Sequence, residues 1–214
     1  MGNNILRAKV SIVGTRVLLI HKFGPEALPL EKQEMSGVPG NNPDEWRKTM
    51  MLTKDGQLYV DPSYMFSSIR DGAKYTKRGR GTIQSNVAAT LQVADDRVLI
   101  DRWIPGFPNG SICDPASMEM PPTDDSELVY LDVRGIRNPS TKSRNVRYRL
   151  ACSKGWRCSF TIEWDRTIVD RNQMQAVLID AGKLSGIGDG RSIGYGRYMV
   201  AAFEIIPNAE ETSA

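Results

Sequence analysis

Apolar and polar side chains alternate with a period of two in several stretches of the chain. Residues 6–12 show this pattern, and residues 146–152 and 156–164 repeat it on either side of a short turn. Such alternation is typical of strands with one buried face, and two such strands joined by a short turn predict an antiparallel hairpin. Apolar runs predict further strands over residues 17–20, 57–60, 127–133 and 198–206.

Two other stretches have the spacing of amphipathic helices. Asp61-Pro62 predicts a helix start, with aspartate as the N-cap and proline at the first helical position. Asp170 and Gln173 have the spacing of a capping box. Apolar residues follow each start at helical spacing: Met65, Phe66, Ile69 and Ala73 in the first stretch, and Met174, Val177, Leu178 and Ala181 in the second. Strands and helices together exclude an all-α fold.

The order of these elements predicts the fold class. Once two irregular segments, residues 24–56 and 82–145, are treated as insertions, the order is strand, helix, strand, strand, helix, strand. This is the order of an α+β, ferredoxin-like β-α-β-β-α-β core, which RNA-recognition domains also use. Within the second insertion, residues 87–93 and 97–103 are candidates for a hairpin. We expect one domain over residues 1–214, built on an antiparallel sheet.

Charged residues are segregated along the chain, although the net charge is only +3. No acid lies between Gly72 and Ala94 or between Val133 and Ser159, and both windows contain several cations. Such windows indicate a basic face that meets an anion, although a single charge run is also typical of a solvated loop. The basic candidates for nucleic-acid binding are Lys74, Lys77, Arg78, Arg80, Arg134, Arg137, Lys142, Arg144 and Arg147.

The Gly-rich segment, residues 186–198, contains five glycines and two arginines. Glycine lets the backbone approach a ligand closely, exposed amides can cradle phosphate, and arginine adds bidentate donors. The alternative is a flexible loop in which the glycines serve tight turns. The segment follows a helix, so it is neither a P-loop nor a dinucleotide-binding turn. Its candidates for nucleic-acid binding are Gly188, Gly190, Arg191, Gly194, Tyr195, Gly196 and Arg197, and Tyr195 and Tyr75 are candidates for base stacking.

Composition narrows the class further. Hydrophobic residues make up 40% of the chain and charged residues 25%, as in globular proteins. The three cysteines form no CxxC pair and the single histidine is His21, so we expect no disulfide framework, no metal site and no cofactor. The sequence shows neither a signal peptide nor a membrane span, and the expected location is the cytoplasm.

Two motifs resemble the RAMP superfamily, the repeat-associated RNA-binding proteins of CRISPR systems. Residues 175–198 resemble its C-terminal G-loop, and residues 58–73 are similar to its strand–Pro-Ser–helix element. The resemblance covers the first strand, residues 57–75 and residues 146–205. It implies a backbone-type subunit, or a divergent mobile-element relative, that binds CRISPR RNA and polymerises along it. It also implies that residues 82–145 supply a thumb-like insertion.

We therefore expect non-catalytic binding of single-stranded nucleic acid through a basic groove and the Gly-rich segment, with RNA of the CRISPR type expected before single-stranded DNA. Further copies of the chain, packed head-to-tail, or the subunits of a ribonucleoprotein are the expected partners, and a membrane is not. An endoribonuclease is the first alternative, with His21 as general acid or base, or with an acid among Glu26, Glu31 and Glu34. A phage or structural assembly protein without a nucleic-acid role is the second.

Overall fold

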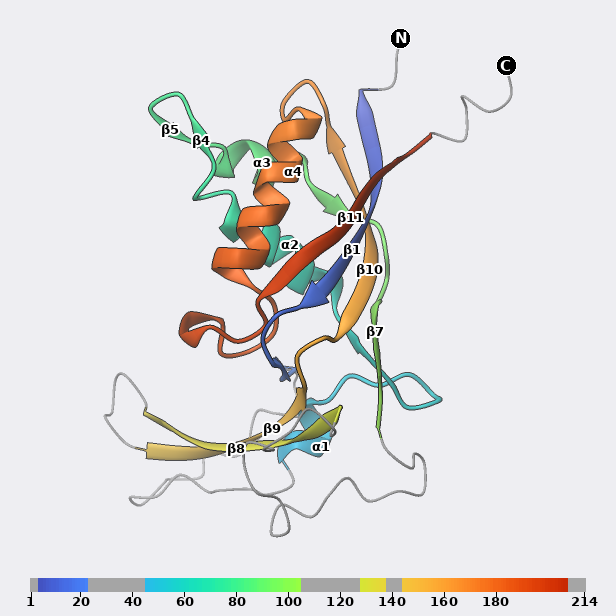
Figure 1. Cartoon of the computed structure of the whole chain (residues 1–214), viewed down its shortest axis with the longest axis vertical. Coiled ribbons are helices and arrows are strands. Elements are labelled where there is room, and N and C mark those ends of the chain that lie inside the picture. Colours follow the sequence, from blue (N-terminus) through green and yellow to red (C-terminus); the bar gives the residue numbers. More distant parts are fainter. Residues whose placement is uncertain (1–3, 23–44, 105–127, 138–143, 208–214) are drawn as a thin grey trace, which may run out of the picture. The chain divides into compact units, whose positions relative to one another are not determined.

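The computed structural model describes residues 4–22, 45–104, 128–137 and 144–207, and the chain divides into two compact units (Figure 1). The first unit consists of residues 1–18, 59–101 and 154–214, and the second of residues 19–58 and 102–153. The second unit therefore takes in most of residues 24–56 and 82–145, the two segments that the sequence assigns to insertions. Among the described residues, no helix has the length and apolar character that crossing a membrane requires.

The first unit is built on a six-stranded sheet. Five of its strands lie in the order β11-β1-β10-β7-β3, and β6 also pairs with β10. Its strands are β1 (Ile5–Gly14), β3 (Gln57–Val60), β6 (Gln92–Val93), β7 (Val98–Trp103), β10 (Arg157–Asp165) and β11 (Tyr198–Ile206). The first strand, β1, lies between β10 and β11 and is antiparallel to both. The fold is thus α+β with an antiparallel sheet, as the alternating pattern predicts.

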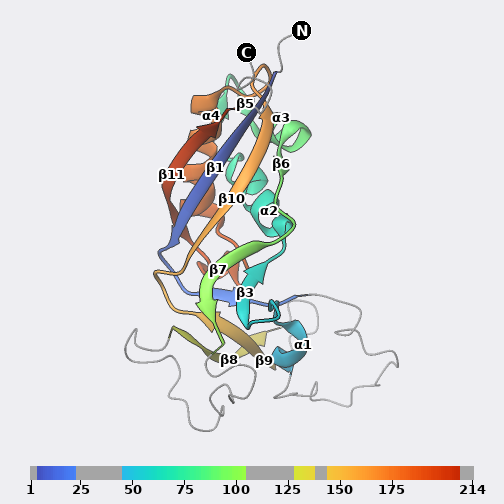
Figure 2. The ribbon, with the colours of Figure 1, turned by 90° about the vertical axis from the view of Figure 1, so that its right-hand side faces the viewer.

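Three helices cover one face of this sheet: α2 (Pro62–Gly72), α3 (Gln84–Thr90) and α4 (Arg171–Asp180) (Figures 1 and 2). The apolar positions of the strands form the core on that face, where Val10 and Trp164 are fully buried. The Nε1 atom of Trp164 donates to the carbonyl of Val169, 2.8 Å away, which satisfies the only polar atom of its ring. The opposite face carries polar side chains, among them exposed Arg7 and Lys9 of β1.

Both helix starts follow the capping rules. The Asp61 carboxylate accepts from the backbone amide of Ser63 at 2.9 Å. At the start of α4, the Asp170 carboxylate accepts from the amide of Gln173 at 2.9 Å, and the Gln173 side chain accepts from the Asp170 amide at 3.1 Å. A single π-helical turn, Ala181–Ser185, extends α4. It passes so close to α2 that a methyl group at Gly72 would lie 2.4 Å from the Cα of Ala181.

The predicted hairpin of residues 146–152 and 156–164 is wrong. Both stretches are strands, but β9 (Arg144–Cys152) pairs with β8 (Val129–Arg137), whereas β10 pairs with β1, β6 and β7. The predicted pairing of residues 87–93 with 97–103 is also wrong, because α3 occupies residues 84–90 and both β6 and β7 lie along β10. A period of two locates a strand but carries no information about its partner.

Two aspartate carboxylates accept hydrogen bonds from backbone amides of β10 on the side where β6 and β7 pair with it. The amide of Thr161 donates to Asp95 at 2.5 Å, and the amide of Arg157 donates to Asp101 at 2.6 Å. The carbonyl of Thr161 accepts from the amide of Ala94 at 2.9 Å. The segment that was predicted to fold on itself therefore satisfies the backbone groups of β10 instead.

A second, three-stranded sheet belongs to the second unit, in the order β2-β9-β8, where β2 is Leu18–Ile20. The short helix α1 (Glu45–Thr49) lies against β9 and buries Trp46. Arg47 stacks on the ring of Trp46, with 4.4 Å between the guanidinium carbon and the ring centroid. The strand predicted over residues 17–20 is present as β2, and it belongs to this separate sheet.

Candidate nucleic-acid interface

The Gly-rich segment has a fixed backbone structure that closes at its two ends. The amide of Ile187 donates to the carbonyl of Gly196 at 3.0 Å, and the amide of Gly196 donates to the carbonyl of Val17 at 2.7 Å. A 3-10 turn, Arg191–Ile193, forms the tip, and Gly190 and Gly194 flank it in the left-handed region. Some of the glycines therefore do serve tight turns, and the hydrogen bonds hold the segment in one conformation.

A side chain does not fit at Gly196. Its φ of +64° lies in the left-handed region, and a methyl group there would lie 1.7 Å from the carbonyl oxygen of Ile187. Gly194 also has a positive φ, of +95°, but a methyl group there meets nothing within 4 Å. Closing the segment thus depends on Gly196, whereas Gly194 serves only the turn.

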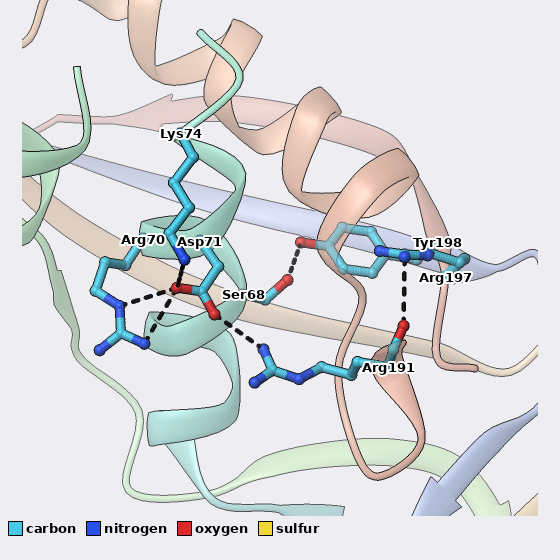
Figure 3. Close-up of polar contacts among 7 residues, drawn as sticks. All are labelled: Ser68, Arg70, Asp71, Lys74, Arg191, Arg197 and Tyr198. Carbon is cyan, nitrogen blue, oxygen red and sulfur yellow. Dashed lines mark hydrogen bonds and ion pairs between the residues drawn. The ribbon is translucent and has the colours of Figure 1, made fainter. Parts of the chain in front are cut away.

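Arg197 connects the 3-10 turn of the Gly-rich segment to residues that follow β1. Its Nη2 atom donates to the carbonyl of Arg191 at 3.3 Å (Figure 3). Its own carbonyl accepts from the amides of Thr15 and Arg16. The sequence predicts that Arg197 binds nucleic acid together with Arg191, and in the structure its contacts position the 3-10 turn.

Asp71 joins the first basic window to the Gly-rich segment (Figure 3). Its carboxylate lies 3.2 Å from the Nη2 atom of Arg70, 3.2 Å from the Nζ atom of Lys74 and 3.5 Å from the Nη1 atom of Arg191. Lys74 and Arg191 are far apart in the sequence, and one carboxylate brings them together. We call these four residues the Asp71 cluster. It contains three cations and one acid, so it carries a net positive charge.

The pKa of Asp71 reflects these contacts. Burial alone would raise the pKa of this carboxyl, but the hydrogen bond from Lys74 and the charges of Arg70 and Lys74 outweigh it and hold the pKa below its usual value. The cations therefore stabilise the ionised form in the folded chain.

We expect Asp71→Asn to lower the free energy of unfolding at neutral pH by about 1 kcal/mol or less, because the pairs are partly exposed. A pKa that is lower in the folded state adds stability above the unfolded value of about 3.9, and this contribution is lost as the pH falls through the folded value. Urea unfolding of both proteins at pH 7 and at pH 3 checks this. A difference that persists or grows at pH 3 would contradict it.

The basic residues that follow Lys74 form a small hairpin of β4 (Lys77–Arg78) and β5 (Gly81–Thr82). Lys77, Arg78 and Arg80 are exposed on it. The Nη1 atom of Arg78 donates to the carbonyl of Ile168 at 2.9 Å, and the hydroxyl of Thr76 donates to Asp180 at 2.8 Å, which anchor the hairpin beside α4. We call residues 77–82 the basic hairpin.

The two candidate stacking residues differ in exposure. The side chain of Tyr75, beside the basic hairpin, is about half exposed. Tyr195 lies partly covered within the Gly-rich segment, where a methyl group at Gly190 would lie 2.9 Å from its ring. Tyr75 is therefore the more accessible surface for a base.

The second basic window lies on the β8–β9 ladder of the second unit. Arg134 grips the buried carboxylate of Asp132, with Nε 2.8 Å from both oxygens and Nη2 2.6 Å from Oδ1. Across the ladder, Arg147 lies opposite Arg134, and Arg149 lies opposite Asp132. The register also places Arg144 opposite Arg137. Lys142 lies outside the described residues.

Sequence reasoning missed Arg70 and Asp71, which complete the cluster around Lys74. The available signal was their position on a predicted helix, where Asp71 and Lys74 are spaced i, i+3 and lie on one face. The ion pair between Asp71 and Arg191 leaves no such signal in the sequence, because the two residues come from distant parts of the chain.

The candidate catalytic residues lie in the second unit or outside the described residues. His21 follows β2 and is half-buried. Glu26, Glu31 and Glu34 fall outside the described residues. Within the part of the chain that the structure describes, no three His, Cys, Asp or Glu side chains are grouped so that they could hold a metal ion. Cys152 and Cys158 are buried and carry free thiols.

No protein-family model and no curated protein sequence matches the chain, but solved structures are similar to it. A chain of the type III-B Cmr-beta complex bound to cognate target RNA is 14% identical, with a TM-score of 0.48; the match covers 94% of this chain and 61% of that one. Cmr6 from Pyrococcus furiosus is 10% identical, with a TM-score of 0.47; the match covers 94% of this chain and 100% of Cmr6.

A chain of a type IV-B CRISPR complex is 12% identical, with a TM-score of 0.43; the match covers 95% of this chain and 91% of that one. The structural neighbours are thus CRISPR-associated proteins, the group to which the resemblance of residues 175–198 points. The chain spans 61% of the length of the Cmr-beta chain. Identities and scores this low transfer no residue role, so the site rests on its own geometry.

Proposed function

We propose that the chain binds single-stranded nucleic acid, of the CRISPR RNA kind, through the Gly-rich segment, the Asp71 cluster and the basic hairpin, without cleaving it. The observation that carries this proposal is the Asp71 cluster, in which one carboxylate holds Lys74 and Arg191 together and leaves an excess of positive charge. The three cations repel one another, which costs free energy, and a bound polyanion offsets this repulsion.

Exposed cations next to the cluster extend the basic surface. Lys77, Arg78 and Arg80 of the basic hairpin follow Lys74 directly in the chain and are exposed. Arginine and lysine contact phosphates without regard to base sequence, which suits a protein that follows a strand. Tyr75 adds an exposed ring on which a base can stack.

The β8–β9 ladder supplies a second basic surface to the proposal. Arg134 and Arg147 lie directly opposite each other, and like charges in that position destabilise a sheet. Asp132 compensates for part of this charge through its contacts with Arg134. Arginine side chains on a sheet surface can contact a phosphate backbone without regard to base sequence.

On β1, β10 and β11, stacking on the open sheet face, the mode of RNA-recognition domains, has little support. On β1, β10 and β11, the face turned away from the helices carries residues such as Lys9, Thr161 and Glu204, paired in register, and no aromatic ring. The proposal therefore assigns binding to the Gly-rich segment and the basic hairpin.

The ferredoxin-like arrangement is part of the same proposal. The elements β1, α2, β6 with β7, β10, α4 and β11 occur in the required order, and the strand order β11-β1-β10-β7 supports it. We also propose that residues 82–145 act as a thumb-like insertion. Copies of the chain are proposed to pack head-to-tail within a cytoplasmic ribonucleoprotein.

Reversing two charges of the basic hairpin tests the proposal. We expect Lys77→Glu with Arg80→Glu to weaken binding of single-stranded RNA by about 10- to 100-fold at low salt, because two phosphate contacts become repulsive. The slope of log K against log salt should fall by about 1.4, or about 0.7 for each lost contact. Filter binding at several salt concentrations measures both quantities, and a denaturing gel of the same reactions shows whether the RNA is cut.

A single reversal provides the matched control. Lys54 is an exposed lysine in a turn of the second unit, outside the proposed surface. Lys54→Glu should leave RNA affinity within about twofold, whereas Lys77→Glu alone should lower it clearly. Equal effects of the two reversals would show that only net charge matters. Cleavage that His21→Ala abolishes would favour the nuclease, and no binding at low salt would favour an assembly protein.

A further inference from the structure

A pocket of about 170 Å³ lies between α2 and the Gly-rich segment. Ser63, Tyr64 and Ser67 line it from the first two turns of α2, and Gly188 and Arg191 line it from the Gly-rich segment. Ser63 and Ser67 are four residues apart, so they share one face of the helix. The pocket thus adjoins the proposed phosphate contacts but has a different lining.

Three of the five residues that line the pocket carry a hydroxyl group. Within the part of the chain that the structure describes, the hydroxyls of Ser63 and Ser67 make no hydrogen bond to another residue. Hydroxyl groups both donate and accept hydrogen bonds. They therefore match a ligand group that also does both, such as another hydroxyl.

Charges of both signs lie around the pocket, and they differ from one side of it to the other. Arg191 is the cation in the lining, and Asp71 pairs with it. Burial raises the pKa of the Tyr64 hydroxyl, and the carboxylates of Asp189 and Asp61 raise it further, against a smaller opposing effect of Arg191. At the Tyr64 hydroxyl these negative charges act against a phosphate group, whereas a neutral sugar hydroxyl is unaffected by them.

We infer that this pocket binds the ribose of one nucleotide of the bound strand and that its hydroxyls recognise the 2′-hydroxyl. This inference rests on the proposed function and adds to it the group through which the chain distinguishes RNA from DNA. The Asp71 cluster and the basic hairpin hold phosphates of either nucleic acid, while the pocket reads the sugar. A 2′-hydroxyl is the group by which proteins tell the two apart.

The test compares short labelled strands of one sequence as RNA, DNA and 2′-O-methyl RNA, by fluorescence anisotropy. The unmodified protein should bind RNA about tenfold more tightly than DNA, the factor for one or two additional hydrogen bonds. The 2′-O-methyl strand should bind like DNA, because its oxygen has lost the proton. In Ser67→Ala and in Tyr64→Phe, affinity for RNA should fall about three- to tenfold while affinity for DNA stays unchanged.

Ser85→Ala is the matched control, because Ser85 is an exposed serine on α3, outside the pocket. It should keep the preference for RNA. Far-ultraviolet circular dichroism and thermal unfolding verify that each variant is folded. Equal losses for RNA and DNA in Ser67→Ala would assign the pocket to phosphate and overturn the inference. Equal affinity of the unmodified protein for RNA and DNA would overturn it as well, while leaving the proposed function intact. Failure to bind either strand would overturn both.

Discussion

Replacing Gly196 with alanine is expected to lower the free energy of unfolding by about 3 kcal/mol or more and to abolish the folded form of the Gly-rich segment. The new methyl group would lie 1.7 Å from the carbonyl oxygen of Ile187, and its next neighbours are backbone atoms of the same residue. Backbone cannot rotate away as a side chain can. The amide bonds from Ile187 to Gly196 and from Gly196 to Val17 must therefore break.

Gly194→Ala is the control for the backbone conformation alone. Gly194 also has a positive φ, but an added methyl group there meets nothing within 4 Å. It should cost about 1 kcal/mol, the usual penalty for a left-handed residue with a side chain. Urea unfolding gives both values, and filter binding should show a much larger loss of RNA affinity in Gly196→Ala. Equal destabilisation by the two substitutions would contradict a role for the close contact with Ile187.

Replacing Asp132 with alanine should destabilise the β8–β9 ladder by about 3 kcal/mol. The Asp132 carboxylate is buried, accepts from Arg134 and lies opposite Arg149, which is also buried. Without it, Arg134 loses its carboxylate partner, and Arg149 stays buried in the same ladder. The loss of an acid partner and the repulsion among the remaining cations act in the same direction.

Hydrogen exchange is the appropriate measurement, because a chain of two compact units need not unfold in one step. Amides of β8 and β9 should lose protection in Asp132→Ala, while those of β1 and β10 keep theirs. Asp96 is exposed, and Asp96→Ala should leave both sets unchanged. Loss of protection throughout the chain would show that the two units unfold together.

Local sequence signals predicted the elements of this fold well. The cap at Asp61, the capping box at Asp170 and the last strand, residues 198–206, occur as expected. These features depend on residues that are close in the sequence, so a short window contains all the information. The helix α3 escaped prediction because it has only seven residues, too few to show a helical period, and includes Val87, whose type favours strands.

Pairing between distant residues could not be predicted in the same way. Residues 146–152 and 156–164 each have the pattern of a strand, but their partners are β8 and β1, and no local rule selects these. The site shows the same limit. Both Lys74 and Arg191 were candidates from charge and glycine content alone, yet their meeting at Asp71 depends on the packing of α2 beside the Gly-rich segment.

The central place of β1 has a consequence for synthesis on the ribosome. Ile12 pairs with Cys158 on one side and Val200 on the other, so both neighbours of the first strand are made late. At roughly 5–20 residues per second, the second neighbour follows about 10–40 s after the first strand. The apolar side of β1 stays without its sheet for that time. Pairing over such separations also slows folding, which makes the growing chain a natural client for chaperones.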